Sequence, residues 1–304
     1  MSESRKETMS MVAIILVNYN GYEDTIRCLE SFREVSYKNY CIYIVDNGSS
    51  NNSYSVLKEY CGCNEDIKTK IIKSTENLGF SGGNNIGIKE ALSGGADYIL
   101  LLNNDTVVTP NFLDVLVSNA DENTIVAPRM MYWKQKNIVW YGGGRLSRTL
   151  GRAWHDNINK EFDRDIDTRH KEVTFISGCC MLIHRAILNK IGLLEEKYFL
   201  YYEDTEYCWR ALNNGIRLYY VGDSVIFHNV SSSTGHNSYL MNYYKIRNRM
   251  YLIKEYVSGI KKITSCLMAY AEIVTGILIG KYQFEAAKAG IKDYKAGIVG
   301  KKKD

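Results

Sequence analysis

The sequence Tyr98-Ile99-Leu100-Leu101-Leu102-Asn103-Asn104-Asp105 joins five apolar or aromatic residues directly to three polar ones. A short apolar run that ends in turn-forming residues is typical of a buried strand. Ligands of open α/β sheets bind outside the carboxyl ends of the strands. We therefore expect the three polar residues to lie at a ligand-binding edge of a sheet.

The sequence before this stretch repeats the same pattern. Apolar runs at residues 12–17 and 41–45, and a predicted strand at residues 67–73, alternate with segments of helical spacing. Strands that alternate with helices predict a parallel, doubly wound α/β sheet. The first two runs are followed by polar residues, and we expect these at the same edge as Asp105. They are Asn18, Asn20 and Asp46.

Residues 77–87 form a stretch that is rich in glycine and asparagine, Asn-Leu-Gly-Phe-Ser-Gly-Gly-Asn-Asn-Ile-Gly. Its second part should open a helix that continues to residue 92. Such a stretch could cradle a phosphate or let the backbone approach a nucleotide, or its glycines could serve a turn conformation alone. It does not contain the Gly-x-Gly-x-x-Gly pattern of dinucleotide-binding proteins.

An acidic cluster, Glu203-Asp204-Thr205-Glu206, follows the aromatic segment 198–202 and opens a predicted helix that continues to residue 212. An aromatic wall suits a sugar, and a desolvated Asp204 could accept a proton from a hydroxyl group. The alternative is that Asp204 is an N-cap. Glu206 and Arg210 have the spacing of an i,i+4 ion pair.

Two further residues are candidates for a cation site. Asp105 ends a strand, where a carboxylate can hold Mg²⁺ or Mn²⁺ and so neutralise a diphosphate leaving group. His228 follows a strand-like run at residues 224–227, and imidazole is a common metal ligand. The alternatives are that Asp105 caps a turn and that His228 is structural.

Taken in order, these motifs resemble those of family 2 glycosyltransferases, particularly the rhamnosyltransferase-like branch. The resemblance covers roughly residues 12–251. The matching stretches are residues 17–21 (Val-Asn-Tyr-Asn-Gly), 45–49 (Val-Asp-Asn-Gly-Ser), 77–87, 101–106 (Leu-Leu-Asn-Asn-Asp-Thr), 177–183 (Ser-Gly-Cys-Cys-Met-Leu-Ile), 191–196 (Ile-Gly-Leu-Leu-Glu-Glu), 202–206 (Tyr-Glu-Asp-Thr-Glu) and His228.

The resemblance implies a GT-A fold, in which helices flank a Rossmann-like mixed sheet, and inverting transfer of a sugar from a nucleotide-diphosphate donor. It also implies that Asp204 is the catalytic base, and that Asp105 and His228 hold a divalent metal. The residues expected to bind substrate are Asn18, Asn20, Asp46, Asn77, Gly79, Asn84, Asn85, Asn104 and Glu203.

Two motifs depart from the family pattern. The usual Asn-Pro-Asp is here Asn103-Asn104-Asp105, which keeps the aspartate. The usual Gly-Gly-Phe-Asp-Glu is here Gly192-Leu193-Leu194-Glu195-Glu196, so the acceptor side is less well defined.

The expected reaction moves a sugar from dTDP-rhamnose or a UDP-sugar to a hydroxyl of a glycan or lipid-linked acceptor in polysaccharide or glycolipid synthesis. A polyprenyl-phosphate sugar synthase is the alternative within the transferases. A non-catalytic nucleotide-sugar-binding module is the alternative outside them, although it predicts damage at Asp105 or Asp204, and both are present. A pyrophosphorylase or dehydrogenase would need a glycine-rich fingerprint after the first strand, where this chain has Asn18-Tyr19-Asn20.

Composition and charge constrain the partners and the location. The net charge of +4 is too small to indicate nucleic acid. The eight cysteines are expected to be free thiols in a reducing cytoplasm, since residues 1–8 carry no secretory signal. Cys61-Gly62-Cys63 has no second pair with zinc spacing.

We expect residues 1–238 to form the transferase domain and residues 239–304 a C-terminal helical region. Glu272 is the only charged residue in residues 263–280, and its central place favours an interfacial or core-packed helix over a membrane span. Lysines gather around and after this segment. They fit peripheral contact with an anionic membrane at its cytoplasmic face, or a solvated helix face.

Overall fold

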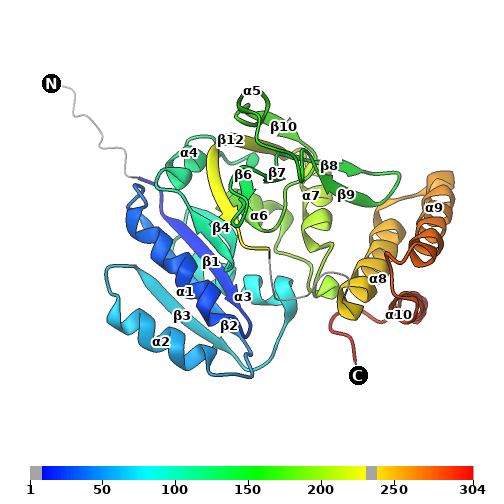
Figure 1. Cartoon of the computed structure of the whole chain (residues 1–304), viewed down its shortest axis with the longest axis horizontal. Helices are drawn as coiled ribbons and strands as arrows, with labels where there is room; N and C mark the ends of the chain where they lie inside the picture. Colours follow the sequence, from blue (N-terminus) through cyan, green and yellow to red (C-terminus); the bar gives the residue numbers. More distant parts are fainter. Residues whose placement is uncertain (1–8, 231–237, 304) are drawn as a thin grey trace.

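The computed structural model describes residues 9–230 and 238–303. Residues 1–8, on which the cytoplasmic prediction rests, lie outside that range. Within the described residues, one mixed sheet of ten strands forms the centre of the molecule, and three helices stand at one end (Figure 1).

The first half of the chain forms the parallel part of the sheet, as predicted. The strands are β1 (Val12–Asn18), β2 (Tyr40–Asn47), β3 (Thr69–Ser74) and β4 (Tyr98–Asn103), in the order β4-β1-β2-β3. Helices α1 (Tyr22–Ser31), α2 (Ser53–Cys63) and α3 (Gly79–Ser93) connect them. In β1, residues 12–16 are buried without alternation, because helices cover both faces of such a sheet.

The second half continues the sheet beyond β4 in mixed directions, in the order β10-β12-β6-β11-β4. Strand β11 (Cys180–His184) is antiparallel to β4 and β6, whereas β12 (Arg217–His228) is parallel to β6 (Thr124–Tyr132). The apolar residues of the segment 173–184 do not form one continuous strand. The chain instead forms β10 (Lys171–Val173) at the sheet edge and β11 in its interior, because the segment between them turns through the site described below.

The shorter elements complete the layers. They are β5 (Thr106–Val108), β7 (Val139–Tyr141), β8 (Gly144–Ser147), β9 (Arg152–His155), α4 (Phe112–Val117), α5 (Arg164–Asp167), α6 (Arg185–Ile191), α7 (Glu203–Asn213) and the 3₁₀ turns at Phe32–Glu34 and Glu196–Tyr198. Strand β5 pairs with β12, and this pairing matters for the site.

The glycine- and asparagine-rich stretch enters a helix earlier than we expected. Helix α3 begins at Gly79, and its glycines let it pack closely on the sheet. A Cβ on Gly83 would lie 2.8 Å from Val17, and one on Gly87 would lie 2.6 Å from Ile15. Gly83 and Gly87 therefore serve helix–sheet packing.

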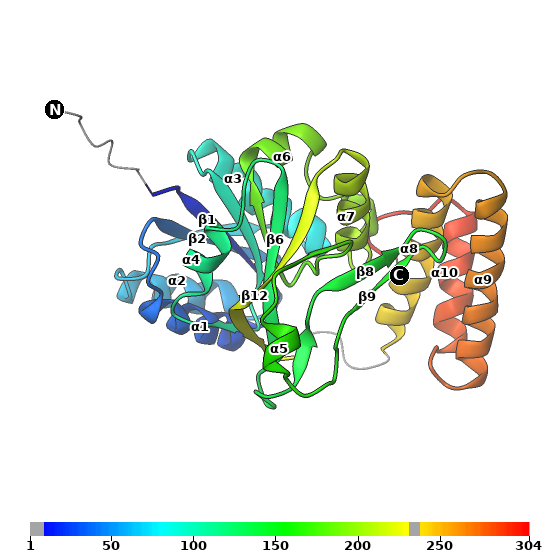
Figure 2. The ribbon, with the colours of Figure 1, turned by 90° about the horizontal axis from the view of Figure 1, so that it is seen from above.

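The C-terminal helices are α8 (Tyr239–Tyr256), α9 (Gly259–Leu278) and α10 (Phe284–Lys295), and Figure 2 shows them side by side. Helix α9 is packed on one side through small residues such as Ser265 and Ala269. Glu272 forms an ion pair with Arg249 at 2.8 Å, which explains its place in an apolar segment. No helix in the described residues is long and apolar enough to cross a membrane.

Helix α8 holds the turn that precedes α7. Nδ2 of Asn248 lies 2.7 Å, 2.9 Å and 2.8 Å from the carbonyl oxygens of Tyr198, Leu200 and Tyr201. Asn248 is completely buried. Three non-glycine residues of this turn have positive φ angles, at Phe199 (61°), Tyr201 (65°) and Tyr202 (76°). Such conformations persist only where the surroundings impose them. The division of the chain at residue 238 stays a prediction, but α8 is in direct contact with the transferase fold.

Gly79 touches the same turn, and this contact can be tested by mutation. Gly79 has φ of +74°, and an added Cβ would lie 2.2 Å from the carbonyl oxygen of Phe199. Gly95 has φ of +84°, but no atom lies within 4 Å of its added Cβ. Gly95→Ala should therefore cost about 1 kcal/mol of backbone strain, and Gly79→Ala about 1–3 kcal/mol more through the clash. Urea unfolding measures both, and equal losses in the two variants would contradict the proposed contact.

Candidate active site

The carboxyl ends of β1 and β2 hold a buried polar pair. Nδ2 of Asn18 donates to Oδ2 of Asp46 at 2.9 Å, and the backbone N–H of Ser49 donates to Oδ1 of Asp46 at 3.2 Å. Asn18 is 0% exposed and Asp46 is 1% exposed. The Asp46 carboxylate therefore has a fixed orientation at the sheet edge, where the nucleotide was expected.

Two other predicted substrate residues lie beside this pair. Nδ2 of Asn104 donates to Oγ1 of Thr25 at 2.9 Å, and the same hydroxyl donates to Oδ1 of Asn18 at 3.1 Å. Asn20 is exposed, has φ of 58°, and accepts a hydrogen bond from the backbone of Ser50. The structure thus joins Asn18 and Asn104 through Thr25, and it joins Asn18 and Asn20 through the Ser49 hydroxyl.

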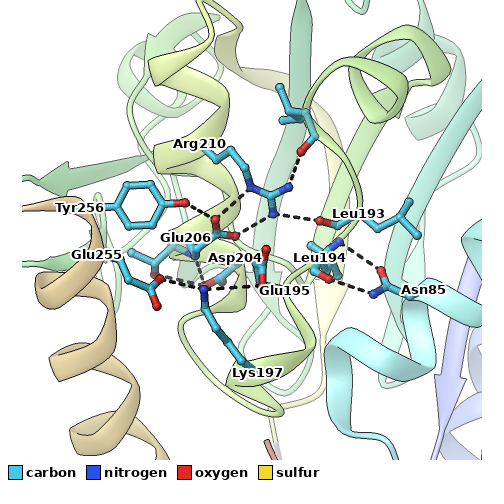
Figure 3. A network of polar contacts seen from close by, with 12 residues as sticks. Asn85, Leu193, Leu194, Glu195, Lys197, Asp204, Glu206, Arg210, Glu255 and Tyr256 are labelled. Atoms are coloured by element: carbon cyan, nitrogen blue, oxygen red, sulfur yellow. Dashed lines mark hydrogen bonds and ion pairs between the residues drawn. The ribbon is translucent and has the colours of Figure 1, made fainter. Parts of the chain in front are cut away.

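The predicted residues of α3 contact the protein itself. Oδ1 of Asn77 accepts from the N–H of Gly79 at 2.9 Å, and Nδ2 of Asn84 donates to the carbonyl of Phe80 at 2.9 Å. Asn85 bonds both backbone groups of Leu194 (Figure 3). It thereby fixes the segment that departs from the family pattern, and a direct role of these residues toward substrate stays a prediction.

Pairing of β5 with β12 brings Asp105 and His228 together. Thr106 lies opposite His228 in the register, and Asp105 directly precedes β5. Nε2 of His228 lies 3.1 Å from Oδ1 of Asp105. The Trp140 ring packs edge-on against the imidazole, with centroids 4.4 Å apart. Burial disfavours charge on His228, but Cys179 and Asp105 outweigh it and raise the pKa of the imidazole.

These two residues fit a divalent cation. Oδ1 of Asp105 is buried and accepts no hydrogen bond within the described residues. Nε2 of His228 is close enough to this oxygen for an ion pair, but the two groups do not have hydrogen-bond geometry. An orphaned carboxylate oxygen beside an imidazole nitrogen is a donor set that Mn²⁺ or Mg²⁺ accepts. No group of three or more His, Cys, Asp or Glu side chains with metal-binding geometry occurs in residues 9–230 and 238–303. The remaining ligands would have to be diphosphate oxygens and water.

Asp204 lies in the first turn of α7 and is not the N-cap, so the capping alternative is wrong. The N-cap is Tyr202, which makes no capping hydrogen bond through its side chain. Oδ2 of Asp204 accepts from the N–H of Gly178 at 3.1 Å, and Oδ1 accepts from Thr205. Burial raises the pKa of Asp204, although these hydrogen bonds oppose it. Such a shift is typical of a carboxylate adapted to accept a proton.

Glu203 points into a dry environment beside Asp204. It is 6% exposed, and its Oε2 has no hydrogen-bond partner in the described part of the chain. Burial, and then the charge of Asp204, raise the pKa of Glu203 well above its usual range. Burial thus disfavours charge on Glu203, whereas the hydrogen bonds from Gly178 and Thr205 favour the charged form of Asp204, the predicted base.

The Glu206–Arg210 ion pair is confirmed at 2.8 Å (Figure 3). Arg210 also donates to the carbonyl of Leu193 at 2.8 Å, and the Tyr256 hydroxyl of α8 donates to Glu206. Lys197 pairs with Glu255 of α8 at 2.8 Å. This network joins α7, α8 and the acceptor-side segment around one buried carboxylate.

Residues 177–179 connect the base to the predicted cation ligands. Gly178 donates its N–H to Asp204, and the carbonyl of Cys179 accepts from the N–H of Asn103 at 2.8 Å. The Cys179 side chain also lies near His228 and contributes to the raised pKa of the imidazole. A Cβ on Gly178 would lie 3.1 Å from the Phe80 ring and 3.4 Å from Cβ of Asp204. The Ser-Gly-Cys motif therefore joins the two halves of the site.

A cavity of about 360 Å³ opens beside Asp204, between β9, α7, α8 and α9. Our reading of the sequence missed its charged lining and its histidine, because these residues come from distant segments with no shared motif. They are Arg152, His155, Lys245, Arg249 and Lys281. Burial lowers the pKa of His155 to about 4, so this residue is neutral.

Comparison with solved structures supports the fold. GalNAc-T7, crystallised with UDP, GalNAc and Mn²⁺, aligns with a TM-score of 0.62 and 16% identity, covering 89% of this chain and 58% of that one. A mannosyltransferase from Pyrobaculum calidifontis, in complex with GDP-Man and Mn²⁺, aligns with a TM-score of 0.60 and 12% identity, covering 96% and 86%. The predicted GT-A fold is confirmed.

Sequence relatives are named glycosyltransferases. A hexosyltransferase of low-salt glycan biosynthesis from Haloferax volcanii is 29% identical over 68% of this chain, and the match spans 63% of that relative. A dTDP-rhamnosyl transferase from Shigella flexneri is 25% identical over 88% of this chain and 86% of the relative. An N-acetylglucosaminyl-diphospho-decaprenol L-rhamnosyltransferase from Mycobacterium tuberculosis is 22% identical over 74% and 78%.

The family match covers more than half of the chain. Residues 13–192 match the family described as "Glycosyl transferase family 2", and they include β1 to β4 and the segment that binds Asp204. The predicted family is confirmed, and so is the prediction that the protein is an enzyme. The chain belongs to glycosyl transferase family 2.

Proposed function

We propose that this protein is an inverting hexosyltransferase that moves a sugar from a nucleotide-diphosphate donor to a hydroxyl of a glycan or lipid-linked acceptor. One observation carries the proposal. The half-buried Asp204 carboxylate lines a cavity and accepts a hydrogen bond from Gly178. The next residue, Cys179, bonds through its carbonyl to Asn103, two residues before Asp105 of the Asp105–His228 pair. A proton acceptor and a leaving-group site are thus adjacent.

The reaction is a single displacement. The acceptor oxygen attacks the anomeric carbon while the bond from that carbon to the diphosphate breaks, and Asp204 takes the hydroxyl proton. The N–H groups of Gly178 and Thr205 fix the orientation of this carboxylate. Burial beside Asp204 raises the pKa of Glu203, which favours its neutral form.

Asp105 and His228 would hold a divalent metal, Mg²⁺ or Mn²⁺. A bound cation supplies charge neutralisation at the departing diphosphate. Asp46 and Asn18, at the ends of β1 and β2, would contact the nucleotide base, with Asn20 and Asn104 beside them. The donor is dTDP-rhamnose or a UDP-sugar, a choice supported by the rhamnosyltransferases among the relatives.

The C-terminal helices would bring the enzyme to an anionic membrane at its cytoplasmic face. Helix α9 exposes large apolar side chains, among them Leu267 (64%) and Leu278 (80%). An apolar groove of about 480 Å³ between α9 and α10 is bordered by three lysines. They are Lys288, Lys292 and Lys295. Apolar area beside basic residues is typical of interfacial helices.

The function is tested by nucleoside-diphosphate release from a panel of nucleotide sugars in the presence of an acceptor extract. Wild-type protein with Mg²⁺ or Mn²⁺ should release diphosphate from one donor, and EDTA should stop the release. Asp204→Asn should lower kcat by about 10²- to 10⁴-fold, because general-base catalysis contributes that much. Because the pKa of Asp204 is raised, activity should fall as pH falls through a value above that of an ordinary aspartate.

Donor binding separates catalysis from binding in this test. Calorimetry should find the same donor affinity in Asp204→Asn as in the wild type. A variant that loses donor binding instead would remove Asp204 from the role of base. If the wild type binds no nucleotide at all, the proposed function is wrong.

The membrane proposal is tested by co-sedimentation with vesicles. Wild-type protein should sediment with vesicles of phosphatidylcholine and phosphatidylglycerol more than with pure phosphatidylcholine. The double variant Leu267→Glu, Leu278→Glu should lose this binding, because charged side chains replace the apolar face. Ile166→Glu, at an apolar residue of α5 that is 50% exposed, is the control. Equal sedimentation of both variants with the wild type would contradict the proposal.

A further inference from the structure

Lys245 of α8 is a half-buried cation without a carboxylate partner. No Asp or Glu oxygen of the described residues lies within 4 Å of its Nζ, which instead lies 4.9 Å from the centroid of the Tyr201 ring. Burial lowers the pKa of Lys245, and the nearby charge of Lys281 lowers it further, while the charge of Asp204 opposes both. A cation in such surroundings is stabilised by an anion that binds there.

The other cations of the cavity share one carboxylate. Glu272 contacts Arg152 at 2.5 Å, Arg249 at 2.8 Å and Lys281 at 3.7 Å. Arg152 and Lys281 remain partly exposed, at 39% and 53% of their side-chain area. Four cations therefore line the cavity, with Glu272 and Asp204 as the two carboxylates among its lining residues. The cavity has an excess of positive charge next to the proposed base.

This cavity is separate from the donor side of the site. Its lining includes Asp204 but neither Asp105 nor His228, and neither Asn18 nor Asp46. In a single displacement the acceptor approaches the anomeric carbon from the face opposite the leaving group. The cavity therefore lies on the acceptor's path, and its cations are not needed for the donor diphosphate.

We propose that Lys245 and Lys281, with Arg152, form an acceptor subsite that binds a phosphoryl group carried by the acceptor. The acceptor is then a phosphate- or diphosphate-linked sugar, whose hydroxyl lies at Asp204 while its phosphate lies against the lysines. Lysine binds phosphate as a mobile point charge, which suits one lysine on α8 and one in the turn between α9 and α10. The identification of the bound molecule as the acceptor rests on the proposed glycosyl transfer, whereas the binding of an anion at this site does not.

Two sources could supply such a phosphoryl group, a lipid or a free sugar phosphate. Ile273 of α9 lines both this cavity and the apolar groove between α9 and α10. A lipid chain attached to the phosphate would therefore have an apolar path directly beside the subsite. A free phosphate would use the lysines alone.

The test is calorimetric binding in EDTA, so that no cation is held at Asp105 and His228. The probes are inorganic pyrophosphate, farnesyl diphosphate and farnesol. Both diphosphates should bind the wild type, and Lys245→Met should weaken them by about 10- to 100-fold, since a charge-assisted contact is lost. Lys245→Arg should retain most of the affinity. Lys254→Met, at an exposed lysine of the same helix, is the control and should bind as the wild type does.

The outcomes divide clearly. Tighter binding of farnesyl diphosphate than of pyrophosphate identifies a lipid-carried phosphoryl group, and equal binding identifies a free one. Three results would overturn the subsite. The first is that farnesol binds as tightly as farnesyl diphosphate, and the second is that Lys245→Met and the wild type bind the diphosphates equally. The third is that the wild type binds neither diphosphate.

Failure of the proposed function is distinguishable from failure of the subsite. If the donor panel gives no transfer but Lys245-dependent diphosphate binding is found, the subsite stands and the transferase reaction falls. If transfer is found and Lys245→Met leaves the acceptor KM unchanged, the reaction stands and the subsite falls.

Discussion

The contact between the Asn248 amide and the carbonyl oxygens of residues 198–201 is the constraint on which the site depends. The turn before α7 contains three non-glycine residues with positive φ. Each of these backbone conformations costs about 1–3 kcal/mol and persists only because the surrounding structure imposes it. Buried carbonyls left without a donor would cost a further 1–3 kcal/mol or so each. Helix α8 therefore fixes the direction in which α7 starts, and with it the position of Asp204.

Helix α8 also lines the cavity through which an acceptor would reach Asp204. Its buried face holds the turn through Asn248, while Lys245 and Arg249 line the cavity beside Asp204. Glu206 connects the arrangement from the other side, through Arg210 and Tyr256. The C-terminal helices thus act as part of the catalytic architecture. A membrane role for α9 would place that architecture next to lipid, where a phosphoryl-linked acceptor could enter.

Much of this could be predicted from the sequence, where local pattern and fold agree. The strands that end at Asn18, Asp46 and Asn103 are confirmed, because continuous burial gives each an unbroken apolar run. The capping reading of Asp204 was wrong, since the strained turn puts Tyr202 at the N-cap. Lys245 and Asn248 could not be found, because their importance arises only from contacts with residues some 45 positions away in the chain. A single sequence gives no signal for such contacts.

The most direct test of this account is the kinetic behaviour of Asn248→Ala, measured beside Asn213→Ala, an exposed asparagine in the last turn of α7. At a temperature where both variants keep the wild-type circular dichroism spectrum, Asn248→Ala should lower kcat by about 10- to 100-fold, because a base displaced by about 1 Å loses that much rate. Donor affinity should not change, and Asn213→Ala should match the wild type. A folded Asn248→Ala enzyme with wild-type kcat would contradict the claim that this contact positions Asp204.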